Sequence, residues 1–126
     1  MGRALALVPD LMFGSRLVAA AQTAGVELEL VSDAAAARER LGSGADGPGP
    51  GWDAFVVDLT DADLDGAGVV ASLREAGRLA STRTLGFYSH VDAAARERAE
   101  RAGFDLVVPR SRMAREAAGL LARVSG

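Results

Sequence analysis

The sequence predicts an α/β fold, a doubly wound sheet of five parallel strands with helices on both faces. Short apolar runs typical of buried strands alternate along the chain with segments whose apolar residues recur at helical spacing. Strict alternation of this kind produces right-handed crossovers and therefore a parallel sheet. With 126 residues, 49% of them hydrophobic, the chain is long enough for one core, and we expect a single domain over residues 1–126.

The first part of the chain supplies two strand–helix units. Its first strand stops at Pro9 and Asp10, its first helix is closed by Gly25, and its second strand alternates apolar and acidic residues. The predicted elements are a strand at 3–8, a helix at 15–24, a strand at 26–31 and a short helix from Ser32 or Asp33 to Leu41. The following residues, 42–51, are rich in Gly and Pro and predict a mobile surface loop.

The second part supplies three further units with a clearer pattern. The run at 53–58 is almost continuously apolar, as expected of a central strand covered on both faces. The predicted elements are strands at 53–58, 84–88 and 106–108 and helices at 66–76, 91–102 and 111–124. We expect Phe87 and Tyr88 to belong to the core.

Composition excludes several classes of protein. The chain has no cysteine, so disulfide scaffolds, thiolate metal sites and cysteine nucleophiles are ruled out. Its only histidine, His90, is expected to be an exposed loop residue rather than a catalytic base. The net charge of −3 argues against nucleic acid as a partner, and no apolar run is long enough to span a membrane. We therefore expect a soluble, cytoplasmic domain.

Acidic residues follow two strands that should be neighbours. Asp58 ends the central apolar strand, where an ionised group must face a crevice because burial would desolvate it. Asp10 follows the first strand, and the carboxyl ends of parallel strands meet at one edge of the sheet. Two carboxylates there could hold Mg²⁺, and an aspartate beside such a metal can attack phosphorus. Simpler roles remain open, because Asp58 could cap a turn and Asp10 could cap a helix.

The order of the elements and the segment 52–66 (WDAFVVDLTDADLDG) resemble the receiver domain of response regulators. The resemblance implies a flavodoxin-like, CheY-like fold with strand order 2-1-3-4-5. It also implies that Asp58 is the phosphoacceptor position and that Asp10, Asp58 and the Thr60 carbonyl are the metal ligands. Arg110 would take the place of the lysine that pairs with the phosphoryl group. The switch hydroxyl would fall on Tyr88 or, after a slip of one residue, on Ser89.

Departures from the family pattern indicate a degenerate receiver. Only one acid, Asp10, follows the first strand where the family has two, and the switch aromatic of the fifth strand is replaced by Val107. Fewer carboxylates weaken Mg²⁺ binding, and without metal we expect Asp58 to pair with Arg110. Arg110 pairing with a crevice carboxylate and Arg110 in solvent both remain open. The acids at 61–66 copy the start of a calcium loop, but the twelfth position is Ser72 instead of Glu, so we expect a solvated loop.

Charge is unevenly distributed, with −7 over residues 1–73 and +4 over residues 74–126. Arg-rich helices at 91–102 and 111–124 would offer a surface to an acidic protein partner or a second copy, unless their arginines merely pair with local glutamates. The expected function is a stand-alone pseudo-receiver that acts by protein contacts, without enzymatic activity. A working receiver phosphorylated on Asp58 by a histidine kinase is the alternative. A small enzyme or nucleotide-binding protein is disfavoured, because no glycine-rich phosphate loop follows the first strand.

Overall fold

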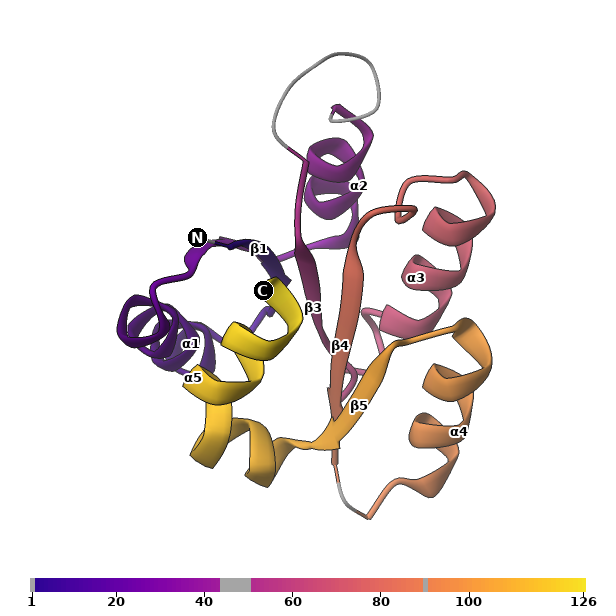
Figure 1. Ribbon diagram of the computed structural model, residues 1–126. Helices are drawn as coiled ribbons and strands as arrows, with labels where there is room; N and C mark the ends of the chain where they lie inside the picture. The colour runs from indigo at the N-terminus through magenta and orange to yellow at the C-terminus, as the bar shows by residue number, and fades with distance from the viewer. Residues whose placement is uncertain (1, 44–50, 90) are drawn as a thin grey trace.

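The computed structural model describes residues 2–43, 51–89 and 91–126, and within these ranges strands and helices alternate along the chain (Figure 1). The strands are β1 (Arg3–Leu7), β2 (Glu27–Val31), β3 (Ala54–Asp58), β4 (Arg83–Tyr88) and β5 (Leu106–Pro109). The helices are α1 (Leu11–Ala24), α2 (Ala34–Ser43), α3 (Gly66–Glu75), α4 (Ala93–Ala102) and α5 (Arg110–Ser125).

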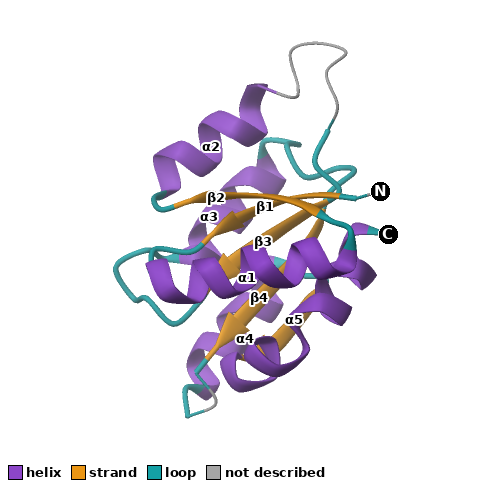
Figure 2. Ribbon diagram, turned by 90° about the vertical axis from the view of Figure 1, so that its left-hand side faces the viewer, coloured by secondary structure: helices purple, strands orange, loops and turns teal. Residues whose placement is uncertain are grey.

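All strand pairs are parallel, and the order in the sheet is β2-β1-β3-β4-β5. Helices α1 and α5 cover one face of the sheet, while α2, α3 and α4 cover the other (Figure 1). In the turned view α1 crosses in front of the strands (Figure 2). The predicted fold class and strand order are therefore confirmed. Among the helices of the described ranges, none has the length and apolar character needed to cross a membrane.

The sheet separates two apolar cores because successive side chains of a strand point to opposite faces. On β3, Val56 packs in the core beneath α1 and α5, whereas Phe55 and Val57 pack in the core beneath α2 and α3. All three are completely buried, which explains the nearly continuous apolar run of this strand. Burial of one such side chain contributes about 1.5–3 kcal/mol. This packing fixes the central strand that carries Asp58.

Helix α1 begins at Leu11, four residues before the predicted start. The Asp10 carboxylate caps it, because its Oδ1 accepts hydrogen bonds from the amides of Met12 at 2.9 Å and Phe13 at 3.0 Å. The apolar pattern missed this first turn because Leu11 and Met12 point to solvent, with 81% and 78% of their surface exposed. The helical period becomes visible only from the buried Phe13 onward.

The loop predicted at 42–51 starts later in the chain than the sequence indicated. Helix α2 runs two residues past its predicted end to Ser43, so Gly42 is helical. Residues 44–50 of the predicted mobile loop lie outside the described residues. Smaller shifts occur at β5, which includes Pro109, and at α5, which starts one residue early at Arg110.

Candidate functional site

The carboxyl ends of the central strands bring the predicted site residues to one edge of the sheet. Leu7 of β1 is aligned with Val57 of β3, and Asp58 is aligned with Phe87 of β4. Tyr88, the last residue of β4, is aligned with Pro109 of β5. The segments that follow these strands therefore place Asp10, Thr60, Ser89 and Arg110 around the end of β3.

Asp58 is held by its own loop. Only 4% of its surface is exposed, and its Oδ1 accepts hydrogen bonds from the Thr60 amide at 2.8 Å and the Thr60 hydroxyl at 2.6 Å. These bonds span two residues, so they require no distant part of the fold. Sequence reasoning assigned Thr60 a role through its carbonyl, but the groups that contact Asp58 are its amide and hydroxyl.

Asp10 and Arg110 form an ion pair across the site. Arg110 Nη2 lies 3.2 Å from Asp10 Oδ2, and the guanidinium carbon of Arg110 is 4.6 Å from the centroid of the Phe13 ring. The pKa of the Asp10 carboxyl is lowered, chiefly because the Phe13 amide donates to it. The Met12 amide and the Arg110 charge lower this pKa further, while desolvation opposes them.

The predicted ion pair between Asp58 and Arg110 is wrong. Arg110 lies over Phe13, in the first turn of α1, and the carboxylate that it contacts there is the helix cap Asp10. One oxygen of the Asp58 carboxylate, Oδ1, meanwhile accepts both hydrogen bonds from Thr60. One of the two alternatives left open for Arg110 was an ion pair with a carboxylate in the crevice. Arg110 forms such a pair, but with Asp10 instead of Asp58.

The hydroxyl on the Asp58 side of β4 belongs to Ser89. Phe87 is aligned with Asp58, and strand alternation places Ser89 on the same face as Phe87 and Tyr88 on the opposite face. Tyr88 is buried, with 7% of its surface exposed, which agrees with the prediction that it belongs to the core. Ser89 instead lines a surface depression together with Thr60 and Arg110.

Two open depressions adjoin at Thr60. The first, about 560 Å³, is acidic and is lined by Pro9, Asp10, Asp58, Thr60, Asp61 and Ala62. The second, about 580 Å³, lies between α1 and α5 and has two arginines and three hydroxyls but no carboxylate in its lining. The edge of the sheet is thus divided into an acidic side and a basic side.

The β3–α3 loop has a fixed geometry that explains its Asp-Gly pair. Asp65 has a left-handed backbone with φ of 48°, and its side chain accepts a hydrogen bond from the Gly68 amide at 3.2 Å, which caps α3. Gly66 is buried, and a Cβ there would stand 2.5 Å from Cγ1 of Val57. Only glycine lets α3 start this close to the strand that carries Asp58.

The donor set does not fit Mg²⁺ in this arrangement. Within the described ranges no group of three or more acidic or histidine side chains could hold a metal ion. Of the predicted ligands, Asp10 uses Oδ1 for the helix cap and Oδ2 for Arg110, and Asp58 uses Oδ1 for Thr60. A divalent cation would have to displace Arg110 from Asp10.

The Arg-rich helices are partly neutralised by local pairs. Arg96 pairs with Glu100 at 3.4 Å and Arg112 with Glu116 at 3.3 Å, both four residues apart. Within the described part of the chain, four arginines of these helices have exposed side chains and no ion pair; these are Arg98, Arg101, Arg115 and Arg123. The predicted local pairing with glutamates is therefore confirmed for Arg96 and Arg112, while a partner surface formed by the other arginines stays a prediction. His90 lies outside the described residues.

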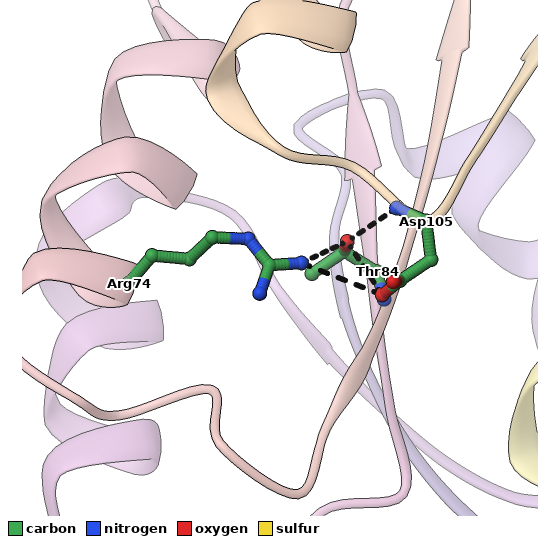
Figure 3. A network of polar contacts seen from close by, with 3 residues as sticks. All are labelled: Arg74, Thr84 and Asp105. Atoms are coloured by element: carbon green, nitrogen blue, oxygen red, sulfur yellow. Dashed lines mark hydrogen bonds and ion pairs between the residues drawn. The ribbon is translucent and has the colours of Figure 1, made fainter.

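A second polar cluster, which sequence reasoning missed, joins the starts of β4 and β5 to the end of α3 (Figure 3). Asp105 Oδ2 accepts hydrogen bonds from the Thr84 amide at 2.7 Å, the Thr84 hydroxyl at 3.1 Å and Arg74 Nη2 at 3.4 Å. The Thr84 hydroxyl accepts in turn from the Asp105 amide at 3.0 Å and from Arg74 Nη2 at 3.1 Å. Spacings of 10 and 21 residues left no local signal in the sequence.

Comparison with known proteins finds the fold but no sequence relative. No protein-family model matches the chain, and no protein of curated function does. A protein described as a response regulator from Chloroflexus aurantiacus superposes with a TM-score of 0.81 at 15% identity, over 98% of this chain and 96% of that one. A Francisella response-regulator receiver domain gives 0.77 at 14% identity, over 99% and 97%.

A third solved structure is the receiver domain of a sensor histidine kinase from Pseudomonas aeruginosa, which holds magnesium in its active-site cleft. It superposes with a TM-score of 0.76 at 18% identity, over 99% of this chain and 98% of that one. At such identities the similarity establishes the fold, and function has to be argued from the site.

Proposed function

We propose that this chain, which has the fold of response-regulator receiver domains, is a signalling domain that acts by protein contacts without phosphorylation of Asp58. The ion pair between Asp10 and Arg110 carries the proposal. In this pair, Asp10 is the carboxylate that would bind a metal ion, and Arg110 is the cation that would hold a phosphoryl group. Because they bind each other, both groups are occupied. On this proposal the chain is not an enzyme.

Charge balance supports this reading. Transfer of a phosphoryl group to a carboxylate needs positive charge placed where negative charge accumulates. The positive charge of Arg110 is offset by Asp10, and the two carboxylates are committed to the helix cap, the ion pair and the Thr60 contacts. Asp58 then serves as a buried loop anchor that positions Thr60 at the surface.

The partner surface fits an acidic protein. Arg98 and Arg101 of α4 and Arg115 and Arg123 of α5 are exposed and leave their charge unpaired within the described ranges. Exposed arginines of this kind accelerate association with an acidic surface, and the effect weakens as salt is added. A second copy of the chain is a further candidate partner for these helices.

A working receiver remains the second candidate, because one observation favours it. Asp58, Ser89 and Arg110 are the acceptor, hydroxyl and cation that the family pattern requires, and all three line depressions that adjoin at Thr60. In that case a histidine kinase would be the phosphodonor, and Mg²⁺ would enter by separating Arg110 from Asp10.

Intact-mass spectrometry separates the two candidates. The chain is incubated with Mg²⁺ and acetyl phosphate, beside a receiver domain of established activity as positive control. We expect the mass of the chain to stay unchanged while the control gains a phosphoryl group. An increment that appears in the wild type and disappears in Asp58→Asn would instead establish the working receiver.

A further inference from the structure

Helices α3 and α4 lie side by side on one face of the sheet (Figure 1). Between the β3–α3 loop, the start of α3 and α4 is a pocket of about 260 Å³, which we call the α3–α4 pocket. Asp61 lines both this pocket and the acidic depression. Asp10, Asp58, Ser89 and Arg110 are not part of its lining, so the pocket is separate from the groups on which the proposed function rests.

The floor of the α3–α4 pocket is apolar and preformed. It consists of Leu59, Ala67 and Ala95. Ala95 is buried, and its amide donates a hydrogen bond to the Asp92 side chain at 2.9 Å, which fixes the first turn of α4. Gly66 brings α3 close to the loop, because a Cβ there would stand 3.1 Å from Cδ2 of Leu59. A small apolar group could therefore pack on this floor without rearrangement of the fold.

Three charged side chains surround the floor without pairing with one another. Arg98 lies one turn after Ala95 on the same face of α4, and it is exposed. Asp61 of the β3–α3 loop and Asp65, the cap of α3, line the pocket as well. Among the described residues, the Arg98 side chain makes no hydrogen bond or ion pair, with these two carboxylates or with any other group. Charges of opposite sign thus face one pocket and remain apart.

Both carboxylates are already oriented by backbone amides. Asp61 Oδ1 accepts a hydrogen bond from the Asp63 amide at 3.0 Å, and Asp65 Oδ1 accepts one from the Gly68 amide at 3.2 Å. Within the described ranges, Oδ2 of each carboxylate makes no hydrogen bond. A ligand that donates to these oxygens would lose little side-chain entropy, because the two rotamers are restricted before it binds.

The mixture of charges excludes simpler ligands. Two carboxylates beside a guanidinium are a poor site for a divalent cation, and no group of three acidic or histidine side chains suited to a metal occurs in the described part of the chain. A plain anion would be repelled by the two aspartates, and a plain cation by Arg98. The volume of the pocket, about 260 Å³, is below the roughly 300 Å³ at which sites for drug-sized ligands begin. The ligand is therefore small and carries both charges.

We infer that the α3–α4 pocket binds a small zwitterion, a free α-amino acid with an apolar side chain. Its ammonium group donates to Asp61 and Asp65, its carboxylate accepts from Arg98, and its side chain packs on the apolar floor. The inference goes beyond the proposed function and does not depend on it. A phosphoryl increment on Asp58 would refute the proposed function and leave the pocket unchanged, since Asp58 is not in its lining.

Titration of the full chain tests the inference, with EDTA present and ionic strength held constant. The amino acids alanine, valine and leucine are added in separate arms to millimolar concentration, and binding is followed by calorimetry and by amide chemical shifts. We expect saturable binding of at least one of them, with the largest shifts over residues 61–67 and 95–98. Lack of saturation in all three arms would overturn the inference.

Two analogues of valine test the need for both charges. Isovalerate lacks the ammonium group and isobutylamine lacks the carboxylate, while both keep the branched apolar part. Each should bind at least about tenfold more weakly than valine, because one wall of the pocket is left unpaired and repels the remaining charge. If either analogue binds as tightly as the amino acid, the ligand is not recognised as a zwitterion and the inference is wrong.

A pair of α4 variants places the carboxylate of the ligand. Arg98→Gln should weaken amino-acid binding about tenfold, because a charge-assisted hydrogen bond is lost. Arg101→Gln removes the same charge three residues further along α4, outside the lining, and should leave the affinity within about twofold. Equal losses in the two variants would reduce the effect to general charge and refute a site.

A pair of loop variants places the ammonium group. Asp61→Asn keeps an oxygen that can accept from the Asp63 amide but removes the charge, and should weaken amino-acid binding about tenfold. Asp63→Asn removes the same charge from the same loop, outside the lining, and should leave the affinity within about twofold. Tighter amino-acid binding in Asp61→Asn would mean that this carboxylate repels the ligand, which contradicts the inference.

Discussion

Two clusters built from the same three residue types, an aspartate, an arginine and a threonine, lie at opposite edges of the sheet. At the starts of β4 and β5, Asp105, Arg74 and Thr84 interlock through five hydrogen bonds that span 10 to 31 residues. At the carboxyl ends, the contacts of Asp58 and the cap of Asp10 span only two or three residues. The Asp10–Arg110 pair is the long-range contact there, and it is half exposed.

The difference separates a cluster that stabilises the fold from the cluster proposed as the functional site. In the first cluster, Thr84 is fully buried. The Thr84 hydroxyl donates one hydrogen bond and accepts two, so its hydrogen-bonding capacity is used completely. Local contacts at the carboxyl edge hold each aspartate in place without joining distant segments. Side chains there can change partners at low cost to the fold, which is what a binding site needs.

The largest loss of stability is expected for Asp105→Ala. The substitution removes the acceptor of the buried Thr84 amide and leaves that donor unsatisfied. We expect a loss of about 2–3 kcal/mol in the free energy of unfolding, measured by urea denaturation. The exposed aspartate Asp63, whose side chain makes no long-range bond, is the control, and Asp63→Ala should change stability by less than about 0.5 kcal/mol. A similar loss in both variants would remove the distinction between the two clusters.

Asp10→Ala is expected to lower the free energy of unfolding by less than half as much as Asp105→Ala. The loss comes from the α1 cap, since the Met12 and Phe13 amides lose their acceptor but remain near water. Asn caps helices as well as Asp, so Asp10→Asn should restore most of the stability while still lacking the charge that faces Arg110. If Asp10→Asn is as unstable as Asp10→Ala in urea denaturation, the ion pair rather than the cap supports the fold.

The fold could be predicted because each element has a local signal. The buried run of β3 and the stops at Gly25 and Gly103, both left-handed in the structure, are readable without tertiary information. The convergence of Asp10, Asp58 and Arg110 followed from the same source, because residues that end parallel strands meet at one edge. Local pattern thus determined the positions of the site residues.

The contacts that the site residues make with one another could not be predicted, because they depend on packing. Which aspartate reaches Arg110 is decided by the stacking of its guanidinium on Phe13 and by the start of α1 at Leu11. The choice between Tyr88 and Ser89 needed the alignment of Asp58 with Phe87. These are properties of register and helix ends, where sequence patterns are least informative.

A smaller change in the free energy of unfolding is expected when the pH is lowered. The pKa of Asp10 in the folded state lies below its ordinary value of 3.8, so its charge stabilises the fold above that value and is lost as pH falls through the folded pKa. The stability difference between wild type and Asp10→Asn should therefore be constant near neutrality and shrink below pH 3.8. Urea denaturation of both proteins at a series of pH values measures it. A difference that grows on acidification would mean that the pKa is raised instead.

The smallest change in stability is expected for Arg110→Ala, which is nevertheless the sharpest test of the carboxyl edge. The side chains of the ion pair are 44% and 46% exposed, so its loss should change the free energy of unfolding by about 0.5 kcal/mol or less. Arg112→Ala, which removes a similarly exposed pair with Glu116 away from the site, is the matched control. Freed from Arg110, the Oδ2 of Asp10 becomes available beside Asp58, and calorimetry should show Mg²⁺ binding strengthened about threefold to tenfold in Arg110→Ala alone. Adding Asp10→Asn to Arg110→Ala should cancel the gain, because the freed carboxylate is then missing. Equal Mg²⁺ affinity in the wild type, Arg110→Ala and Arg112→Ala would show that the ion pair does not withhold Asp10 from a metal, and would remove the observation on which the phosphorylation-independent reading depends.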